Sequence, residues 1–172
     1  MDLPPRQEQG IVTVNHQTLP EGLHPDTLAV REALPRSQWG EHCEALYMTS
    51  SFVQPDCETA ARRFAAQEDG FTYSRTSNPT VTSFEKRLAA MEGTECAVAT
   101  STGMSAILLV ALTTLKAGDH VICSRSMFGS TIKLLGTEMA RFGVETSFVA
   151  QTDVAAWQAA IQPNTRLLFA ET

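Results

Sequence analysis

A short run of small polar residues, Thr100-Ser101-Thr102-Gly103, stands between an apolar stretch and the start of an apolar helix pattern. The first N–H groups of a helix have no partner within the helix, and the helix dipole favours negative charge there, so this turn can hold a phosphate. The hydroxyls of Ser101 and Thr102 can donate as well. The run matches neither the P-loop pattern nor G-x-G-x-x-G, which excludes a P-loop and gives little support to dinucleotide binding. An ordinary strand-to-helix cap explains this feature equally well.

A second polar segment, residues 73–80 (YSRTSNPT), precedes another helix pattern. The guanidinium of Arg75 can hold a phosphate with two parallel hydrogen bonds, and the hydroxyl of Tyr73 can donate a further one. The alternative is a surface turn whose only role is to cap the helix that begins at Asn78-Pro79.

Two more candidates follow predicted strands. Phe128, beside Gly129, can place its ring over a planar ligand, and Glu171 supplies a carboxylate at the chain's last predicted strand end. Loop packing for Phe128 and solvent exposure for Glu171 are the simpler interpretations.

The elements that must position these residues alternate from residue 95 onward. Apolar runs predict strands at 96–99, 120–123, 144–149 and 166–170, separated by helices at 104–115, at 130–142 and after Asp153. The helix at 104–115 is apolar nearly all round, so we expect it to be buried. This order predicts an α/β fold with a largely parallel sheet, whose ligands bind at the carboxyl ends of the strands.

Before residue 95 the pattern is less regular. The first forty residues carry five prolines, which indicates an extended arm lying on the domain or on a neighbouring subunit. Helices are predicted at 57–67, capped by Asp56, and from Pro79 to Gly93. The second of these has one apolar face, formed by Val81, Phe84, Leu88 and Met91.

The composition excludes several classes of function. Of the 172 residues, 43% are hydrophobic and the formal net charge is −6, which disfavours nucleic-acid binding. No apolar stretch approaches the roughly 20 residues that span a bilayer, and no secretory signal is present, so we expect a cytoplasmic protein. The four cysteines form no C-x-x-C pair, which argues against a metal site. Cys96 and Cys123 lie in apolar runs and are expected to be buried thiols.

Three motifs, in order and with matching gaps, carry a resemblance. They are Y-S-R-x-x-N-P-T from Tyr73, G-x-E from Gly93 and T-G-M-x-A from Thr102. Together they resemble the Cys/Met-metabolism enzymes that depend on pyridoxal 5'-phosphate (PLP), which include cystathionine synthases and lyases, methionine γ-lyase and homoserine-ester sulfhydrylases. The resemblance covers residues 45–172.

The resemblance implies the aspartate aminotransferase-like fold (fold type I) of PLP-dependent transferases. We expect residues 1–60 to form an N-terminal arm and subunit-contact segment. Residues 61–172 would form the first part of the PLP-binding α/β domain, with the rest of that domain and a C-terminal domain outside this sequence.

A closer likeness, in residues 27–31, 44–50 and 126–130, is to the sulfhydrylases that use O-succinylhomoserine. It implies a γ-replacement in which sulfide displaces succinate to give homocysteine, a step of methionine biosynthesis catalysed within this trans-sulfuration enzyme family. Other members commonly have Tyr where this chain has Phe128. Phenylalanine can stack on the cofactor but cannot transfer a proton, so another group must take any such role.

The site residues implied by the resemblance come from two subunits. The amides of Gly103 and Met104, with Thr102 nearby, would hold the cofactor phosphate, Phe128 would cover the ring, and Glu171 would lie near the cofactor edge. Tyr73 and Arg75 would bind the phosphate in the adjacent subunit. A complete site would therefore need at least a dimer, and the family usually forms homotetramers from two such dimers.

The catalytic lysine is not evident. The lysines are Lys86, Lys116 and Lys133, and none has the Ser/Thr-rich setting that the family uses, so all three are interpreted as surface charges. We expect the Schiff-base lysine, the acidic partner of the pyridine nitrogen and the arginine for the substrate carboxylate to lie beyond residue 172. The isolated 172-residue chain is therefore expected to be inactive.

Two alternatives remain open. One is a sibling enzyme, cystathionine γ-synthase or methionine γ-lyase, since acceptor choice depends on loops partly outside this sequence. The other is a non-catalytic phosphate-binding or nucleotide-binding α/β domain that uses the loop at 100–103. That domain would be a self-sufficient monomer with Tyr73 and Arg75 on its own ligand.

Overall fold

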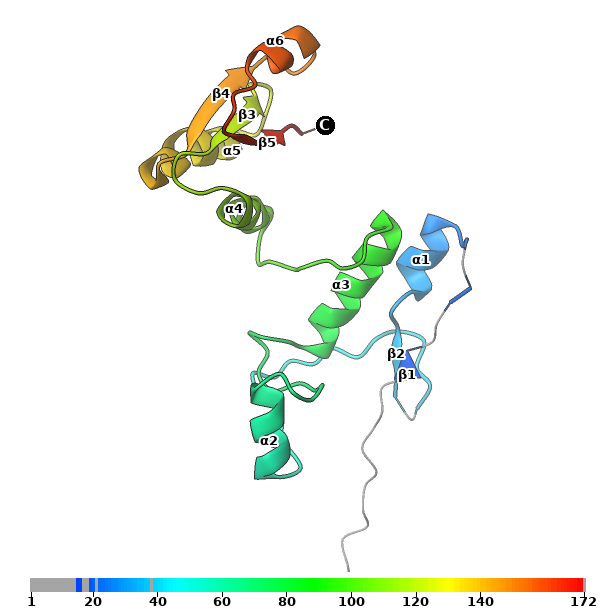
Figure 1. Ribbon diagram of the computed structural model, residues 1–172. Coiled ribbons are helices and arrows are strands. Elements are labelled where there is room, and N and C mark those ends of the chain that lie inside the picture. Colours follow the sequence, from blue (N-terminus) through cyan, green and yellow to red (C-terminus); the bar gives the residue numbers. More distant parts are fainter. Residues whose placement is uncertain (1–14, 17–18, 21, 38, 172) are drawn as a thin grey trace, which may run out of the picture. The chain divides into compact units, whose positions relative to one another are not determined.

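The structure is a computed structural model that describes residues 15–16, 19–20, 22–37 and 39–171. The chain forms two compact units, Met1–Ala99 and Thr100–Thr172, called here the N-terminal unit and the C-terminal unit. Figure 1 shows the elements of both units.

The N-terminal unit contains a short helix that the sequence analysis did not predict. Helix α1 (Pro25–Arg31) has proline at its first position and Asp26 in its first turn, where both stabilise a helix start. The two-residue strands β1 (Asn15–His16) and β2 (Pro35–Arg36) pair antiparallel. The expectation of an extended arm is therefore wrong for α1, and residues 1–14 of that arm lie outside the described residues.

Helix α2 (Cys57–Phe64) begins where the sequence predicts, after the N-cap Asp56. The Asp56 carboxylate accepts the Thr59 N–H at 2.7 Å and the Thr59 hydroxyl at 3.0 Å. These bonds lower the pKa of the Asp56 carboxyl. The helix ends three residues earlier than the predicted 57–67.

Helix α3 (Pro79–Glu92), unlike α2, begins and ends where the sequence predicts. Asn78 caps it by accepting the Thr80 N–H at 2.9 Å. Gly93 closes it with a φ of 63°, a left-handed conformation that glycine adopts without strain.

The apolar face predicted for α3 is not buried. Its side chains are 37% to 57% exposed, and they are Val81, Phe84, Leu88 and Met91. The buried residues of α3 include the small Ser83 and Ala89 instead. Helix α1 packs beside α3 (Figure 1), and small side chains permit such close approach.

Arg87 ties α3 to two other segments of the N-terminal unit. Its Nε donates to the carbonyl of Glu32 at 2.9 Å, and its Nη1 is 3.0 Å from Oε1 of Glu44. The hydrogen bond from the guanidinium lowers the pKa of the Glu44 carboxyl.

The strand predicted at residues 96–99 is not formed within the described part of the chain. The N–H of Ala99 donates to Oε1 of Glu85 at 2.8 Å instead of to a strand neighbour. An extended segment becomes a strand only when a neighbour completes its ladder. Cys96 is exposed, so the predicted burial is wrong for Cys96 and confirmed for Cys123.

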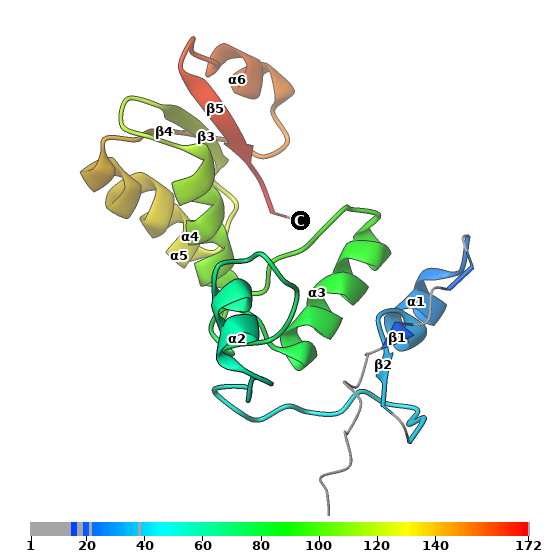
Figure 2. The same ribbon diagram turned by 60° about the horizontal axis from the view of Figure 1, so that its bottom comes forward.

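The C-terminal unit has the parallel sheet that the alternating pattern predicts. Strands β3 (His120–Ser124), β4 (Glu145–Val149) and β5 (Thr165–Phe169) lie in the order β4-β3-β5, and every residue of β3 is buried. Figures 1 and 2 show helix α4 (Gly103–Thr114) on one side of this sheet and α6 (Val154–Ala159) on the other.

The helix predicted at 130–142 is three successive pieces. They are α5 (Gly129–Lys133), the π-helix η1 (Leu134–Glu138) and the 3₁₀ helix η2 (Met139–Phe142). The wider π turn coincides with two tertiary contacts that periodicity does not reveal.

Both contacts are made with β4. The hydroxyl of Thr146 donates to the carbonyl of Leu135 at 2.8 Å. Gly136 packs against Phe148 so closely that an added Cβ would lie 2.9 Å from two ring carbons. A π-helix redirects backbone carbonyls in this way over one turn.

Helix α4 was expected to be buried on all sides, and this expectation is wrong. Ala111 and the following Leu115 join a core with residues of β3, η1 and η2. Four other apolar side chains of α4 are 37% to 52% exposed, and they are Leu108, Leu109, Val110 and Leu112. In the C-terminal unit the sheet and α5–η2 cover one side of the helix.

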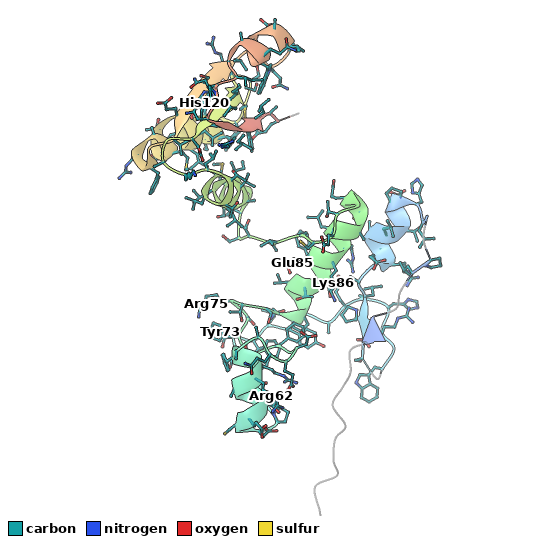
Figure 3. The ribbon with its side chains drawn as sticks, viewed as in Figure 1. Arg62, Tyr73, Arg75, Glu85, Lys86 and His120 are labelled. Atoms are coloured by element: carbon teal, nitrogen blue, oxygen red, sulfur yellow. The ribbon has the colours of Figure 1, made fainter. Side chains whose placement is uncertain are left out.

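His120, the first residue of β3, is a buried polar residue of the sheet. Its Nδ1 is 2.8 Å from the hydroxyl of Thr165 and its Nε2 is 2.9 Å from the hydroxyl of Ser147. Figure 3 labels this side chain within the sheet. Because both ring nitrogens have partners, the buried imidazole links all three strands without an unpaired polar atom.

Among the residues that the structure describes, no helix combines the length and the apolar character that crossing a membrane requires.

Candidate functional site

The first part of the site is the start of α4. Thr102 is the N-cap, and its Oγ1 accepts the Ser105 N–H at 3.1 Å. The carbonyl of Thr102 accepts the Ala106 N–H. The N–H groups of Gly103 and Met104 precede these bonds, so they have no acceptor within the helix and are available to an anion.

The space in front of the N-terminus of α4 is open to solvent. Residues 101–103 are exposed, and a Cβ built on Gly103 would meet no atom within 4 Å. The hydroxyl of Thr102 also lies 2.9 Å from that of Ser105. Thr102 therefore caps the helix, and its hydroxyl can also donate to a bound anion.

The second part of the site is the loop after β3. Phe128 is the N-cap residue of α5 but has no side-chain capping bond, and its ring is 64% exposed. Its N–H donates to Oε2 of Glu171 at 3.2 Å.

Glu171 joins the loop to the rest of the unit. Its Oε1 accepts the Thr131 hydroxyl at 3.1 Å. The same hydroxyl oxygen lies 3.9 Å from Sδ of Met104. Three predicted site residues, Met104, Phe128 and Glu171, thus contact buried Thr131 near the carboxyl ends of the strands.

An open pocket of about 530 Å³ lies at this edge. Its lining residues are Arg125, Ser126, Met127, Phe128, Gln151, Thr152 and Glu171. All of them follow one of the three strands, as expected for a ligand site in an open α/β sheet.

The third part of the site, Tyr73 and Arg75, belongs to the N-terminal unit. Cζ of Arg75 lies 5.5 Å from the centroid of the Tyr73 ring. Figure 3 shows both side chains on the loop between α2 and α3. Both are exposed, and within the described chain Arg75 has no carboxylate partner, whereas Arg62 is paired with Glu58 and Glu68.

The backbone of this loop is held by several hydrogen bonds, although the side chains of Tyr73 and Arg75 are exposed. Buried Asn78 donates from Nδ2 to the carbonyl of Tyr47 at 3.0 Å and to the hydroxyl of Ser74 at 2.9 Å. Ser74 also donates its N–H to the carbonyl of Ser50 at 2.9 Å, and Tyr73 forms a β-bridge with Ser51. Asn78 therefore caps α3 and fixes the loop at once, and the cap leaves the side chains of Tyr73 and Arg75 exposed.

The three lysines lie on exposed positions of the two units. Lys116 lies in the turn that enters β3, at the edge opposite the pocket, and Lys133 is the exposed last residue of α5. Lys86 is exposed on α3 in the N-terminal unit.

Two residues of the site were missed by the sequence analysis. Thr131 has no exposed surface and links α4, α5 and Glu171. Gln151 donates from Nε2 to the carbonyl of Glu171 at 2.8 Å. The position of Gln151 just after β4 was the one available signal, because residues there share an edge with Phe128 and Glu171.

Comparison with known proteins shows which family the chain resembles. A family model described as Cys/Met metabolism PLP-dependent enzyme matches residues 26–172. The chain is 51% identical over 152 residues to the O-succinylhomoserine sulfhydrylase of Pseudomonas aeruginosa, covering 88% of this chain and 38% of that protein. It is 39% identical over 146 residues to an L-methionine gamma-lyase of Fusobacterium nucleatum, covering 85% of this chain and 37% of that protein.

A solved structure shares the fold. It is that of a Campylobacter jejuni protein assigned as an O-acetylhomoserine (thiol)-lyase, which carries a pyridoxyl-lysine phosphate. It superposes with a TM-score of 0.79 at 28% identity, over 87% of this chain and 37% of that one. The chain thus spans less than two-fifths of the length of the relatives it matches.

Proposed function

Because the chain belongs to the family of Cys/Met metabolism PLP-dependent enzymes, we propose that the whole protein catalyses a γ-replacement on O-succinylhomoserine. Sulfide would enter, succinate would leave and homocysteine would form. The observation that carries this choice is the 51% identity to an O-succinylhomoserine sulfhydrylase, against 39% to a methionine γ-lyase.

The start of α4 fits the phosphate of PLP. It offers two N–H groups without helical acceptors, at Gly103 and Met104, and open space in front of them. The hydroxyl of Thr102 stands at the same end. The exposed ring of Phe128, on the loop gathered around Thr131 with Met104, fits the face of the cofactor ring.

Tyr73 and Arg75 would bind the phosphate held by a second copy of the chain. This proposal is supported by the position of the two side chains, which form an exposed cation–π pair. The guanidinium of that pair has no carboxylate partner within the described residues. A guanidinium fork and a phenol are suitable donors to a phosphate. A site of this kind requires at least a dimer, and we propose a homotetramer built from two such dimers.

The bound cofactor supplies an electron sink that lets protons leave carbon atoms of the substrate. The residues of this chain hold its phosphate, fix the plane of its ring and shield one face from water. Phe128 contributes no proton transfer, so that role falls to other groups. Within the C-terminal unit, Lys116 and Lys133 do not line the pocket, and Lys86 belongs to the N-terminal unit. We propose that the Schiff-base lysine is supplied from outside residues 1–172.

The proposed reaction belongs to methionine biosynthesis, and we propose a cytoplasmic location. The whole protein, saturated with PLP, tests the reaction directly. We expect homocysteine from O-succinylhomoserine and sulfide, with release of one succinate per homocysteine.

The sibling enzymes give different products in the same assay. Cystathionine formed faster from cysteine than homocysteine from sulfide would identify a cystathionine γ-synthase. Methanethiol released from methionine alone would identify a γ-lyase, the alternative supported by the 39% identity to such an enzyme. Residues 1–172 alone should release no succinate.

A further inference from the structure

The three strand ends of the C-terminal unit are tied together by one side chain, that of Gln151. Its Oε1 accepts the hydroxyl of Ser124, the last residue of β3, at 2.9 Å. Its Nε2 donates to the carbonyl of Glu171, which follows β5, at 2.8 Å. Its own carbonyl accepts Nε1–H of Trp157 on α6 at 3.2 Å. Gln151 therefore fixes where the backbone of Glu171 lies.

The carboxylate of Glu171 is in turn used within the protein. One oxygen accepts the backbone N–H of Phe128 at 3.2 Å and the other accepts the hydroxyl of buried Thr131 at 3.1 Å. Phe128 is the N-cap residue of α5 and makes no side-chain capping bond. Glu171, from the segment after β5, accepts the N–H of Phe128 at this helix start. Each oxygen accepts one hydrogen bond from the protein, and Oε2 accepts it from the backbone that carries the Phe128 ring.

We propose that Glu171 and Gln151 are positioning residues that set the angle of the Phe128 ring. The proposal rests on the proposed function, in which Phe128 covers the cofactor ring. It gives Glu171, which was expected near the cofactor edge, an indirect role through the N–H of Phe128. Gln151 acts one step further back, through the backbone of Glu171.

The test uses the whole PLP-saturated protein and the substitution Glu171→Gln. The amide keeps the shape of the side chain but lacks the charge and offers a single acceptor atom to two donors. We expect the visible circular dichroism band of the bound cofactor to change. We expect kcat to fall about tenfold or more, because misplacing a covering group lowers the chemical step. The dissociation constant of PLP should change by less than about threefold, since α4 still holds the phosphate.

Two further variants sharpen the experiment. Glu145→Gln makes the same chemical change on an exposed residue at the N-terminal end of β4, whereas Gln151 follows its C-terminal end. This variant should have the dichroism band and kcat of the wild type. Phe128→Leu removes the ring that Glu171 and Gln151 are proposed to position. If the proposal holds, adding Glu171→Gln to Phe128→Leu produces little further loss of kcat.

Three outcomes would overturn the proposal. An unchanged dichroism band and kcat in Glu171→Gln, with only a lower melting temperature, would mean a purely structural role. A loss of PLP affinity that adds fully to that of Phe128→Leu would mean direct contact with the cofactor. A wild-type protein that binds no PLP would remove the proposed function and this proposal together, and is distinguished by the absence of any visible band.

Discussion

The guanidinium of Arg75 lies over the ring of Tyr73, with Cζ 5.5 Å from the ring centroid. A cation over an aromatic face is attracted by the ring quadrupole. The pair therefore presents a guanidinium and a phenol together, on a loop that Asn78 fixes to the segment before α2. This arrangement leads to the first prediction.

Tyr73→Phe removes the hydroxyl but keeps the ring under Arg75. We expect the PLP dissociation constant of the whole protein to rise roughly threefold to tenfold, the effect of one hydrogen bond. Tyr73→Ala also removes the ring that lies under the guanidinium, and it should raise the PLP dissociation constant further. Equilibrium titration followed by cofactor absorbance measures both. Tyr47→Phe, the same change at the other tyrosine, is the control, and an equal effect there would contradict the assignment.

Gly103→Pro tests the phosphate-binding end of α4. Proline fits the first position of a helix, and the extended Thr102 is compatible with a following proline. The substitution removes one N–H donor to a charged phosphate, so PLP should bind roughly tenfold to a hundredfold more weakly. Gly103→Ala keeps the N–H and has open space for its Cβ, so its effect should be much smaller. Equal losses in the two variants would exclude the N–H as a ligand.

A mixing experiment tests whether the site is shared between subunits. Arg75→Ala and Gly103→Pro proteins are each expected to have low activity. Dissociating, mixing and reassociating them creates hybrid pairs with one intact site and one doubly defective site. Random pairing in a symmetric dimer then restores about one quarter of wild-type activity. If both residues served the same chain's site, mixing would restore nothing.

Gly136→Ala should destabilise the C-terminal unit. The new Cβ would lie 2.9 Å from two carbons of the Phe148 ring, so the ring or the helix must shift. We expect the free energy of unfolding to fall by about 1–3 kcal/mol, as in other overpacked cores. Gly129→Ala is the matched control, because its Cβ would meet nothing within 4 Å. Denaturant unfolding of the whole protein, followed by a probe in this unit, compares the two.

Cys123 makes a pH-dependent contribution to stability. Burial raises the pKa of its thiol to about 11 from the 9.0 of a free thiol. The unfolded state loses this proton near pH 9 while the folded state keeps it. The contribution is therefore fully present below pH 9 and is lost as the pH rises to about 11. The stability difference between wild type and Cys123→Ala should shrink over this window, and the thiol should react slowly with a disulfide reagent at pH 8 in the native state.

The sequence by itself determined the features that depend on neighbours within a few residues. Asp56, Asn78 and Asp153 cap the helices they were predicted to cap, because an N-cap bonds N–H groups two or three residues away. The apolar runs of β3, β4 and β5 likewise identified the parallel sheet. The motifs around Arg75 and Gly103 indicated the family that the comparisons establish.

Tertiary structure decided what depends on residues far apart in the chain. Whether residues 96–99 form a strand depends on a neighbouring ladder, and the π turn of η1 accompanies the contacts of Leu135 and Gly136 with β4. Glu171 meets Phe128 across 43 positions of sequence, and Thr131 across 40. Periodicity reports which side of an element is apolar. It does not report which atom of another element completes a hydrogen bond, so the bonds that orient the Phe128 loop became evident only in the folded chain.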